Sequence, residues 1–302
     1  MEQYISNDNT VAKYVHDDGS ETAIKTLNPN DVGCGGSGRN KFNVFASCSV
    51  GCPVNCAFCY LTTKGFKYER LDYQEITSNI NDAIEMELIR RPELMKIPMN
   101  ISWMGMGDAW LDLDTISNVV SDVMLDWKNV LNFEGVDIST TLPTISNRDI
   151  TNIKDINKTL LDSGKLSVKE ENRSHVRVFY SLHSLKNEVR KRLIPRTLDL
   201  HISLPYLEDL GKKFNVIYHY MFLEGINDKP EDIDALIRYF RAGDKQLRIL
   251  RYNKCPNSKF DESRNFNNII KKLLAEIPNL KVQISPGGEV KAACGMFIMS
   301  NN

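Results

Sequence analysis

The stretch FNVFASCSVGCPVNCAFCY, residues 42–60, joins a short predicted strand to a loop that is rich in cysteine. The strand is FNVFAS, and the loop begins directly after it. Four of the chain's seven cysteines lie in this loop, at Cys48, Cys52, Cys56 and Cys59. The last three have the spacing CxxxCxxC. We therefore expect a site that depends on sulfur chemistry at the end of this strand.

Strands and helices alternate along the chain that follows the cysteine loop. Further strands are predicted at 99–104, 134–140, 176–182, 214–223, 246–252 and 280–284. Helices are predicted at 72–91, 114–128, 146–163, 199–213, 230–240 and 262–276. Repeated βα units imply parallel strands with helices outside them. We predict an α/β fold, a partial (β/α)6 barrel, with its ligands at the carboxyl ends of the strands.

The segment before the first barrel strand has a different pattern. Residues 11–27 alternate in polarity around a DDG turn, which predicts a β-hairpin. Residues 28–41 are rich in glycine, asparagine and serine and are predicted to form a loop. We divide the chain into an N-terminal β-hairpin and glycine-rich loop, residues 1–41, and a core domain, residues 42–302.

Composition limits the classes of protein that the chain can belong to. It has 302 residues, a formal net charge of -1 and a hydrophobic fraction of 42%, as ordinary globular proteins do. No overall basic field attracts nucleic acid. The N-terminus, MEQYISNDNT, has no signal-peptide pattern, and no apolar run approaches the roughly 20 residues that span a bilayer. We expect a cytoplasmic protein with reduced cysteines and no membrane partner.

Three thiolates from one tight loop suit an iron-sulfur cluster. A 4Fe-4S cluster normally has four cysteine ligands, so ligation by Cys52, Cys56 and Cys59 alone leaves one iron open. An open iron can bind the amino and carboxyl groups of S-adenosylmethionine (SAM). The alternative is a zinc site, which usually needs paired CxxC or Cys/His units, and the sequence has no second pair. The spacing, with an aromatic residue before the last cysteine, resembles the radical SAM signature.

A more specific resemblance covers residues 11 to 299. The chain resembles the RlmN/Cfr family of radical SAM rRNA adenine methyltransferases. The matching stretches occur in the family's order: CSVGCPVNCAFC, WMGMGDAWLD, DISTTLPTI, YSLHSLKNEVRKRLIP, YHYMFLEGINDKPED, LRILRYNKCP and VKAACGMF.

The resemblance implies a particular chemistry. In the family, one SAM methylates a cysteine, and a second is cleaved to a 5′-deoxyadenosyl radical that takes a hydrogen from the new methyl group. The carbon radical adds to adenine, a base removes a proton, and a second cysteine releases the product by forming a disulfide. The cofactors carry the demanding chemistry, and the protein positions them.

The resemblance also assigns roles to residues. Cys294 corresponds to the methylated cysteine, although alone it would be a buried structural thiol. Glu21 corresponds to the proton acceptor, although alone it would be a solvent-facing hairpin residue. Gly107 and Asp108 correspond to a Gly-Glu pair that holds the SAM amino group, with a shorter acid here. The other predicted cofactor contacts are Ser139, Ser181, Leu182, His183 and Asn253.

The sequence departs from the family pattern in several places. Phe45 occupies the position of the cysteine that releases the product, so we expect Cys48 or Cys34 to take that role. Ala109 replaces a proline that follows the Gly-Glu pair. The family's N-terminal helical RNA-binding domain has no counterpart before the hairpin, so we expect the chain to lack it.

The expected partners follow from the resemblance. We expect an RNA substrate, rRNA or tRNA, or a free nucleotide, and a reductant such as flavodoxin or ferredoxin, with the enzyme acting as a monomer. The basic run from Lys186 to Arg196 is either a phosphate contact or a solvated helix face. A radical enzyme that acts on a peptide or metabolite, and a non-catalytic metal-binding module, are the alternatives.

Overall fold

The computed structural model describes residues 1–27, 40–146, 149–162, 175–283, 287–292 and 296. Its main feature is a ten-stranded sheet in the order β1-β2-β3-β4-β7-β8-β9-β10-β11-β12. Neighbouring strands from β4 to β12 are parallel. These strands are β4 Lys41–Phe45, β7 Pro98–Trp103, β8 Asn132–Thr140, β9 Val176–Ser181, β10 Asn215–Met221, β11 Gln246–Leu250 and β12 Leu280–Gln283. The predicted partial barrel is therefore confirmed.

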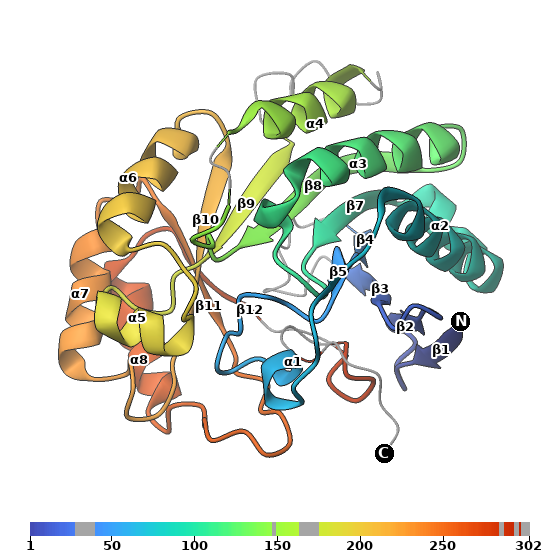
Figure 1. The fold of residues 1–302 in the computed structure, drawn as a ribbon. Helices are drawn as coiled ribbons and strands as arrows, with labels where there is room; N and C mark the ends of the chain where they lie inside the picture. Colours follow the sequence, from blue (N-terminus) through green and yellow to red (C-terminus); the bar gives the residue numbers. More distant parts are fainter. Residues whose placement is uncertain (28–39, 147–148, 163–174, 284–286, 293–295, 297–302) are drawn as a thin grey trace.

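Six helices of eleven or more residues connect successive parallel strands within the described residues, and Figure 1 shows them on the convex side of the curved sheet. They are α2 Tyr73–Arg90, α3 Leu113–Trp127, α4 Thr151–Asp162, α6 Leu200–Gly211, α7 Pro230–Phe240 and α8 Phe266–Glu276. A capping box at Asp72 and Glu75 begins α2, and Pro230 begins α7. No helix of the described residues combines the length and apolar character that crossing a membrane requires.

The predicted hairpin is part of a larger antiparallel extension of the same sheet. β2 Val11–Val15 and β3 Glu21–Leu27 pair as predicted, and β3 also pairs with β4. The edge strand β1 Glu2–Ile5, which pairs with β2, was not predicted, because its short polar sequence has no strand pattern. Figure 1 shows this extension beside β4.

The two faces of the sheet carry different side chains. The outer face and the helices form the main hydrophobic core, which includes Val44, Ile101, Ile138, Val178 and Ile249. The inner face is polar: strand register places Asn43, Ser102, Asp137, Arg177, His219 and Arg248 on it. Such alternation is the expected result of successive strand residues pointing to opposite faces.

Short elements that the sequence did not predict lie at the carboxyl ends of the strands. The helices are α1 Tyr60–Thr63 and α5 Asn187–Leu193, and the strands are β5 Ser49–Val50 and β6 Glu69–Arg70. They are too short for a periodic signal, and β5 pairs with β6 in a separate two-stranded sheet. These elements shape the loop that carries the cysteines.

Candidate active site

The loops that follow β4 and β7 are joined into one unit. Ser47 Oγ donates to the Glu21 carbonyl at 2.6 Å and accepts from the Met106 N–H at 2.9 Å. The Cys48 N–H donates to the Met106 carbonyl at 3.0 Å. Gly107 has φ of +97°, and a Cβ there would lie 2.4 Å from Cys48 Sγ. Only glycine fits this contact, so GMGD and the cysteine loop form a single close-packed junction.

The cysteine loop is held by the segment that contains α5. The Ala57 N–H donates to the Leu193 carbonyl at 2.8 Å, and Arg196 Nη1 donates to the Pro53 carbonyl at 2.7 Å. Cys59 is the N-cap of α1 and donates its N–H to the Cys56 carbonyl at 3.0 Å. These hydrogen bonds hold the backbone of the loop that carries the predicted metal ligands. The bonds from Leu193 and Arg196 come from the segment that connects β9 to β10.

The donor chemistry of Cys52, Cys56 and Cys59 fits an iron-sulfur cluster. All three side chains are partly buried, and none is in a disulfide. Burial raises the pKa of Cys52 and Cys56, and the neighbouring thiols raise it further. Ionisation of one thiol therefore disfavours ionisation of the others. Among the described residues, no three His, Cys, Asp or Glu side chains are already gathered as a metal site. Because metal binding deprotonates thiols, a cluster would replace these mutually unfavourable charges with bonds to iron.

Asp108 lies beside these thiols and is tightly held. Its Oδ2 accepts from the Thr141 N–H and hydroxyl, both at 2.8 Å, and its Oδ1 accepts from the Trp110 N–H at 3.1 Å. Burial raises its pKa against these hydrogen bonds. The charge of Asp108 also raises the pKa of Cys48, Cys52 and Cys56. The shorter acid is therefore near the predicted cofactor, with its carboxylate bound to its own chain.

His183 follows β9 and is buried with a left-handed backbone, φ of +52°. Its ring meets Phe58 of the cysteine loop edge-on, with centroids 5.1 Å apart. Burial lowers its pKa to about 3, helped by Arg190, so the imidazole is neutral at pH 7. Its Nδ1 has no partner among the described residues, which leaves an acceptor or donor for a ligand.

The other predicted SAM contacts differ in how available they are. Ser139, Ser181 and Asn253 are partly exposed near the carboxyl ends of β8, β9 and β11. Leu182, in contrast, is fully buried in the main core. Its N–H donates to the His219 carbonyl, and its own carbonyl accepts from Ser184. The three polar residues are thus placed to meet a ligand more readily than Leu182.

Glu21 is fully buried, so its interpretation as a solvent-facing hairpin residue is wrong. Its Oε1 accepts from Lys13 Nζ at 3.3 Å, and both side chains are 0% exposed. Burial raises the pKa of Glu21 to about 7, although the charge of Lys13 opposes that shift. The sequence analysis did not identify Lys13. The alternation of residues in the predicted hairpin, which places Lys13 on the same face as Glu21, could have indicated it.

The thiols other than the three predicted metal ligands have different surroundings. Cys48 packs against the main core, and its Sγ lies 3.6 Å from the Met106 carbonyl. Burial raises the pKa of Cys48 to about 12, so its thiol is protonated at neutral pH. Cys255, which had no predicted role, is buried in a small cluster with Cys52 and Cys59. Cys34 and Cys294 lie outside the described residues.

The basic run at 186–196 is largely used within the chain. Lys186 pairs with Asp232 at 2.8 Å, and Lys191 pairs with Asp199. Arg190 is fully buried and donates to the carbonyls of Thr141, Ser181 and Leu198. Most of these cations therefore support the fold near the site.

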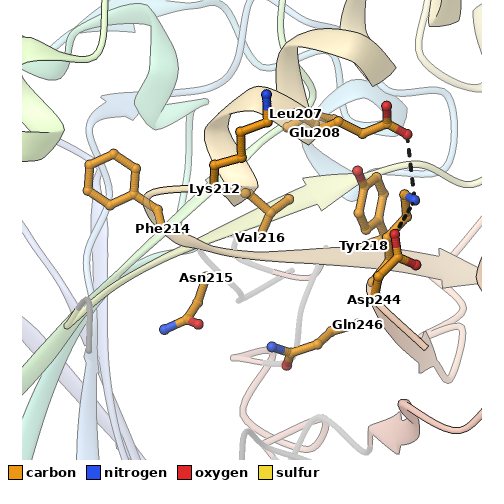
Figure 2. Close-up of a pocket in the computed structure, with 11 residues that line it drawn as sticks. Leu207, Glu208, Lys212, Phe214, Asn215, Val216, Tyr218, Asp244 and Gln246 are labelled. Atoms are coloured by element: carbon orange, nitrogen blue, oxygen red, sulfur yellow. Dashed lines mark hydrogen bonds and ion pairs between the residues drawn. The ribbon is translucent and has the colours of Figure 1, made fainter. Parts of the chain in front are cut away.

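A pocket of about 440 Å³ lies at the opposite end of the strands (Figure 2). Asn215 and Gln246, the first residues of β10 and β11, line it, and Lys245 pairs with Glu208 and Asp244 there. Because β4, β10 and β11 belong to one parallel series, this pocket is remote from the cysteine loop. It is not part of the candidate active site.

Several known proteins are similar to the chain over most of its length. A probable dual-specificity RNA methyltransferase RlmN from Dictyoglomus turgidum is 25% identical, over 86% of this chain and 70% of that one. The ribosomal RNA large subunit methyltransferase N from Nitrosopumilus maritimus is 27% identical, over 98% and 79%. The probable RlmN from Chlorobaculum tepidum is 30% identical, over 83% and 63%. No protein-family model matches the chain.

A solved structure has the same fold. The radical SAM methyltransferase from Sphaerobacter thermophilus aligns with a TM-score of 0.69 and 21% identity, over 98% of this chain and 80% of that one. The partial barrel, with a CxxxCxxC loop after its first parallel strand, is that of a radical SAM enzyme. The relatives that match most of this chain by sequence are named as RlmN-type methyltransferases, which agrees with the resemblance seen in the sequence.

Proposed function

We propose that the chain is a radical SAM methyltransferase that adds a methyl group to a ring carbon of an adenine in RNA. The observation that carries this proposal is the junction of the cysteine loop with the GMGD loop, made by Ser47 and Gly107. Relatives named RNA methyltransferases support the substrate class. The sulfur loop, a neutral buried histidine and a buried glutamate all lie at this end of the sheet.

Cys52, Cys56 and Cys59 would hold a 4Fe-4S cluster and leave one iron for SAM. When bound, the cluster supplies the electron that cleaves the sulfonium of SAM. Ser139, Ser181, His183 and Asn253 would bind and orient SAM from the ends of β8, β9 and β11. Asp108 would place a negative charge near the bound SAM, since its charge already acts on the thiols of Cys52 and Cys56.

Three further residues would act on the substrate. Cys294 would take the methyl group from one SAM and carry it to the adenine. Glu21 would accept the proton that the ring carbon loses, while the unpaired electron left on the ring by radical addition would return to the oxidised cluster. The buried carboxyl of Glu21 has a pKa suited to that role near pH 7. The thiol of Cys48 or Cys34 would then attack the Cys294 sulfur. The carbon–sulfur bond breaks, its electron pair stays with the transferred carbon, and a proton completes the methyl group.

Anaerobic incubation with methyl-labelled SAM tests the proposal directly. We expect label in adenine of total RNA, 5′-deoxyadenosine as co-product, and a methylated Cys294 in the isolated enzyme by mass spectrometry. Iron-free protein that forms no 5′-deoxyadenosine would contradict the radical chemistry and support a zinc or other metal-binding module. An unmodified Cys294 in active enzyme would remove the methyltransferase mechanism.

The same chemistry on a free nucleotide is a second candidate. It is favoured by the internal pairing of Lys186, Arg190 and Lys191, which leaves little of the basic run for phosphates. Label in added nucleotides and none in RNA would establish this second candidate. We further propose a flavodoxin- or ferredoxin-type reductant, a cytoplasmic location and a monomeric enzyme; sedimentation of the holoenzyme tests the last point.

The releasing thiol is tested by separate substitutions. If Cys48 is the thiol that breaks the bond to Cys294, Cys48→Ala should accumulate a covalent protein–RNA adduct. If Cys34 is that thiol, Cys34→Ala should accumulate it instead. Cys255→Ala is the matched control, because it removes a buried thiol from the neighbouring cluster. Normal turnover in both test variants would show that product release uses another route.

A further inference from the structure

The antiparallel extension carries an unusual set of buried charges on its inner face. Strand register places Lys13, Glu21 and Lys25 on one side, because Val15 pairs with Glu21 and Val11 pairs with Lys25. Lys13 and Glu21 are 0% exposed, and Lys25 is 1% exposed. Burying such groups is costly unless each charge has a specific partner. The burial of these three charges therefore indicates a specific role for them, because apolar side chains would fill the same space at a lower cost.

Lys13 and Glu21 form an asymmetric pair. Lys13 Nζ lies 3.3 Å from Glu21 Oε1. Glu21 Oε2 is buried, and no hydrogen-bond partner for it exists among the described residues. A structural ion pair would be expected to satisfy both oxygens, since leaving a buried acceptor without a hydrogen bond is unfavourable. One oxygen is thus fixed while the other is left for a further donor.

This pair lies next to the candidate active site. The backbone carbonyl of Glu21 accepts from Ser47 Oγ, the same atom that binds the Met106 N–H of the GMGD loop. Lys25, on the same face, donates to the Ala292 carbonyl at 2.5 Å. Ala292 packs in the small cluster that contains Met106 and Cys59. The face that bears Glu21 is therefore joined to the cysteine loop at two points.

We propose that Lys13 is a positioning residue for Glu21: it orients the carboxylate and stabilises its negative charge while Oε2 takes the proton from the substrate. The inference rests on the proposed function, in which Glu21 is the proton acceptor. Lys13 does not touch the substrate; its ammonium holds Oε1 and stabilises the negative charge before the transfer. After the transfer, the proton stays on Oε2 until solvent or product removes it.

The expected pH effect follows from the charges around Glu21. Lys13 on β2 and Lys291 near the C-terminus lower its pKa, while burial raises it to about 7. When the Lys13 charge is removed, the carboxylate of Glu21 loses a stabilising positive neighbour. The effect of burial then dominates, so the pKa of Glu21 rises. More of the enzyme is then protonated at neutral pH, and the acidic limb of the rate profile moves to higher pH. A rise of about one pH unit corresponds to about a tenfold loss on that limb.

The test uses the full-length holoenzyme under single-turnover conditions from pH 6 to 9. Lys13→Met should lose about tenfold in product formation at pH 6.5 and recover as the pH rises. Lys13→Arg keeps the charge and should restore the normal profile. Lys41→Met is the matched control, since Lys41 is also a buried inner-face lysine, on β4, and pairs with Glu134 instead. Its profile should be unchanged.

A second readout is independent of turnover. Carbon-13 NMR of the Glu21 carboxyl should show a higher titration midpoint in Lys13→Met than in the native protein. Lys13→Gln, whose amide can still donate to Oε1, serves if the methionine variant fails to fold. An unchanged midpoint and rate profile in folded Lys13→Met or Lys13→Gln, with Glu21→Gln inactive, overturns the role of Lys13 alone. Full activity of Glu21→Gln instead overturns the proposed role of Glu21.

Discussion

The outer and inner faces of the sheet carry different kinds of side chain. On the outer face, apolar side chains such as Val44 and Ile101 pack against helices in one continuous core. On the inner face, Asp137 accepts two hydrogen bonds from Arg177, at 2.6 and 2.7 Å, and one from Ser102. Most of the polar residues on the inner face are buried as well, so exposure does not explain the difference.

The difference separates two physical tasks. Burying apolar area on the outer face supplies the free energy that holds the helices to the strands, at about 25 cal/mol per Å². The inner face pays a desolvation cost for its charges and gains directional contacts at the strand ends. Substitutions should therefore damage stability on one face and chemistry on the other.

The largest effect should come from the metal ligands on the functional side. Cys56→Ala should abolish cluster loading and 5′-deoxyadenosine formation, because two thiolates cannot replace the three-ligand loop. Unfolding midpoints of the metal-free proteins should change little, since Cys56 is partly exposed. Iron and sulfide analysis checks the loading, with Cys255→Ala as the control. Native iron content in Cys56→Ala would show that this thiol is not a ligand.

A core substitution on the outer face should do the reverse. Ile101→Ala removes a fully buried side chain of β7 and should lower the free energy of unfolding by about 2–5 kcal/mol. Denaturant unfolding measures the loss. Ile89→Ala on α2 is the control, since Ile89 is 71% exposed and should change stability by under about 0.5 kcal/mol. Equal losses in the two variants would contradict the assignment of the core.

Gly107 lies where the sheet meets the candidate active site, so a substitution there should affect both stability and SAM binding. Gly107→Ala should destabilise the chain by about 1–3 kcal/mol and weaken SAM binding, since the new Cβ meets Cys48 Sγ. Gly65→Ala is a matched control: Gly65 has φ of +69°, but nothing lies within 4 Å of its added Cβ. The difference between the variants isolates the close contact from backbone strain. Calorimetry of unfolding and of SAM binding measures both, and equal effects would remove the contact as the cause.

The buried histidine should make stability depend on pH. The pKa of His183 is lowered to about 3 in the folded chain, from 6.5, so the unfolded chain binds its proton first as the pH falls. The stabilisation is present above pH 6.5 and is lost between there and about pH 3, at up to about 1.4 kcal/mol per pH unit. Unfolding at pH 7 and pH 5 should show a smaller pH effect in His183→Gln than in the native chain. His201→Gln, which alters an exposed histidine, should leave the slope unchanged.

Much of the fold was predictable because it depends on patterns that are local in sequence. The expected strand 134–140 lies within β8, and the expected helix 230–240 coincides with α7. The helix expected at 146–163 is shorter: it begins at Thr151, after Asp149 has accepted from the Thr151 N–H. The short helices α1 and α5 were not predicted because they span too few turns for periodicity.

The site was predictable to a smaller extent. The spacing of the cysteines and the GMGD motif indicated the class of chemistry, because ligand spacing is written directly in the chain. Sequence reasoning gave Cys255 no role and, without the resemblance, placed Glu21 on a hairpin facing solvent. Both depend on which distant segments pack against them, and the pattern within a hairpin does not specify that.

The order of residues alone determined the alternation of strands and helices and the spacing of the sulfur ligands, because each depends on neighbours a few positions apart. Only the tertiary structure decided that Lys13 meets Glu21, that Asp108 binds Thr141, and that Arg190 is buried beneath the site. Those contacts require particular strand registers and helix positions. They form when the complete sheet packs around its core. Burial then removes the water that would otherwise solvate each charge, so each charge needs a partner within the chain.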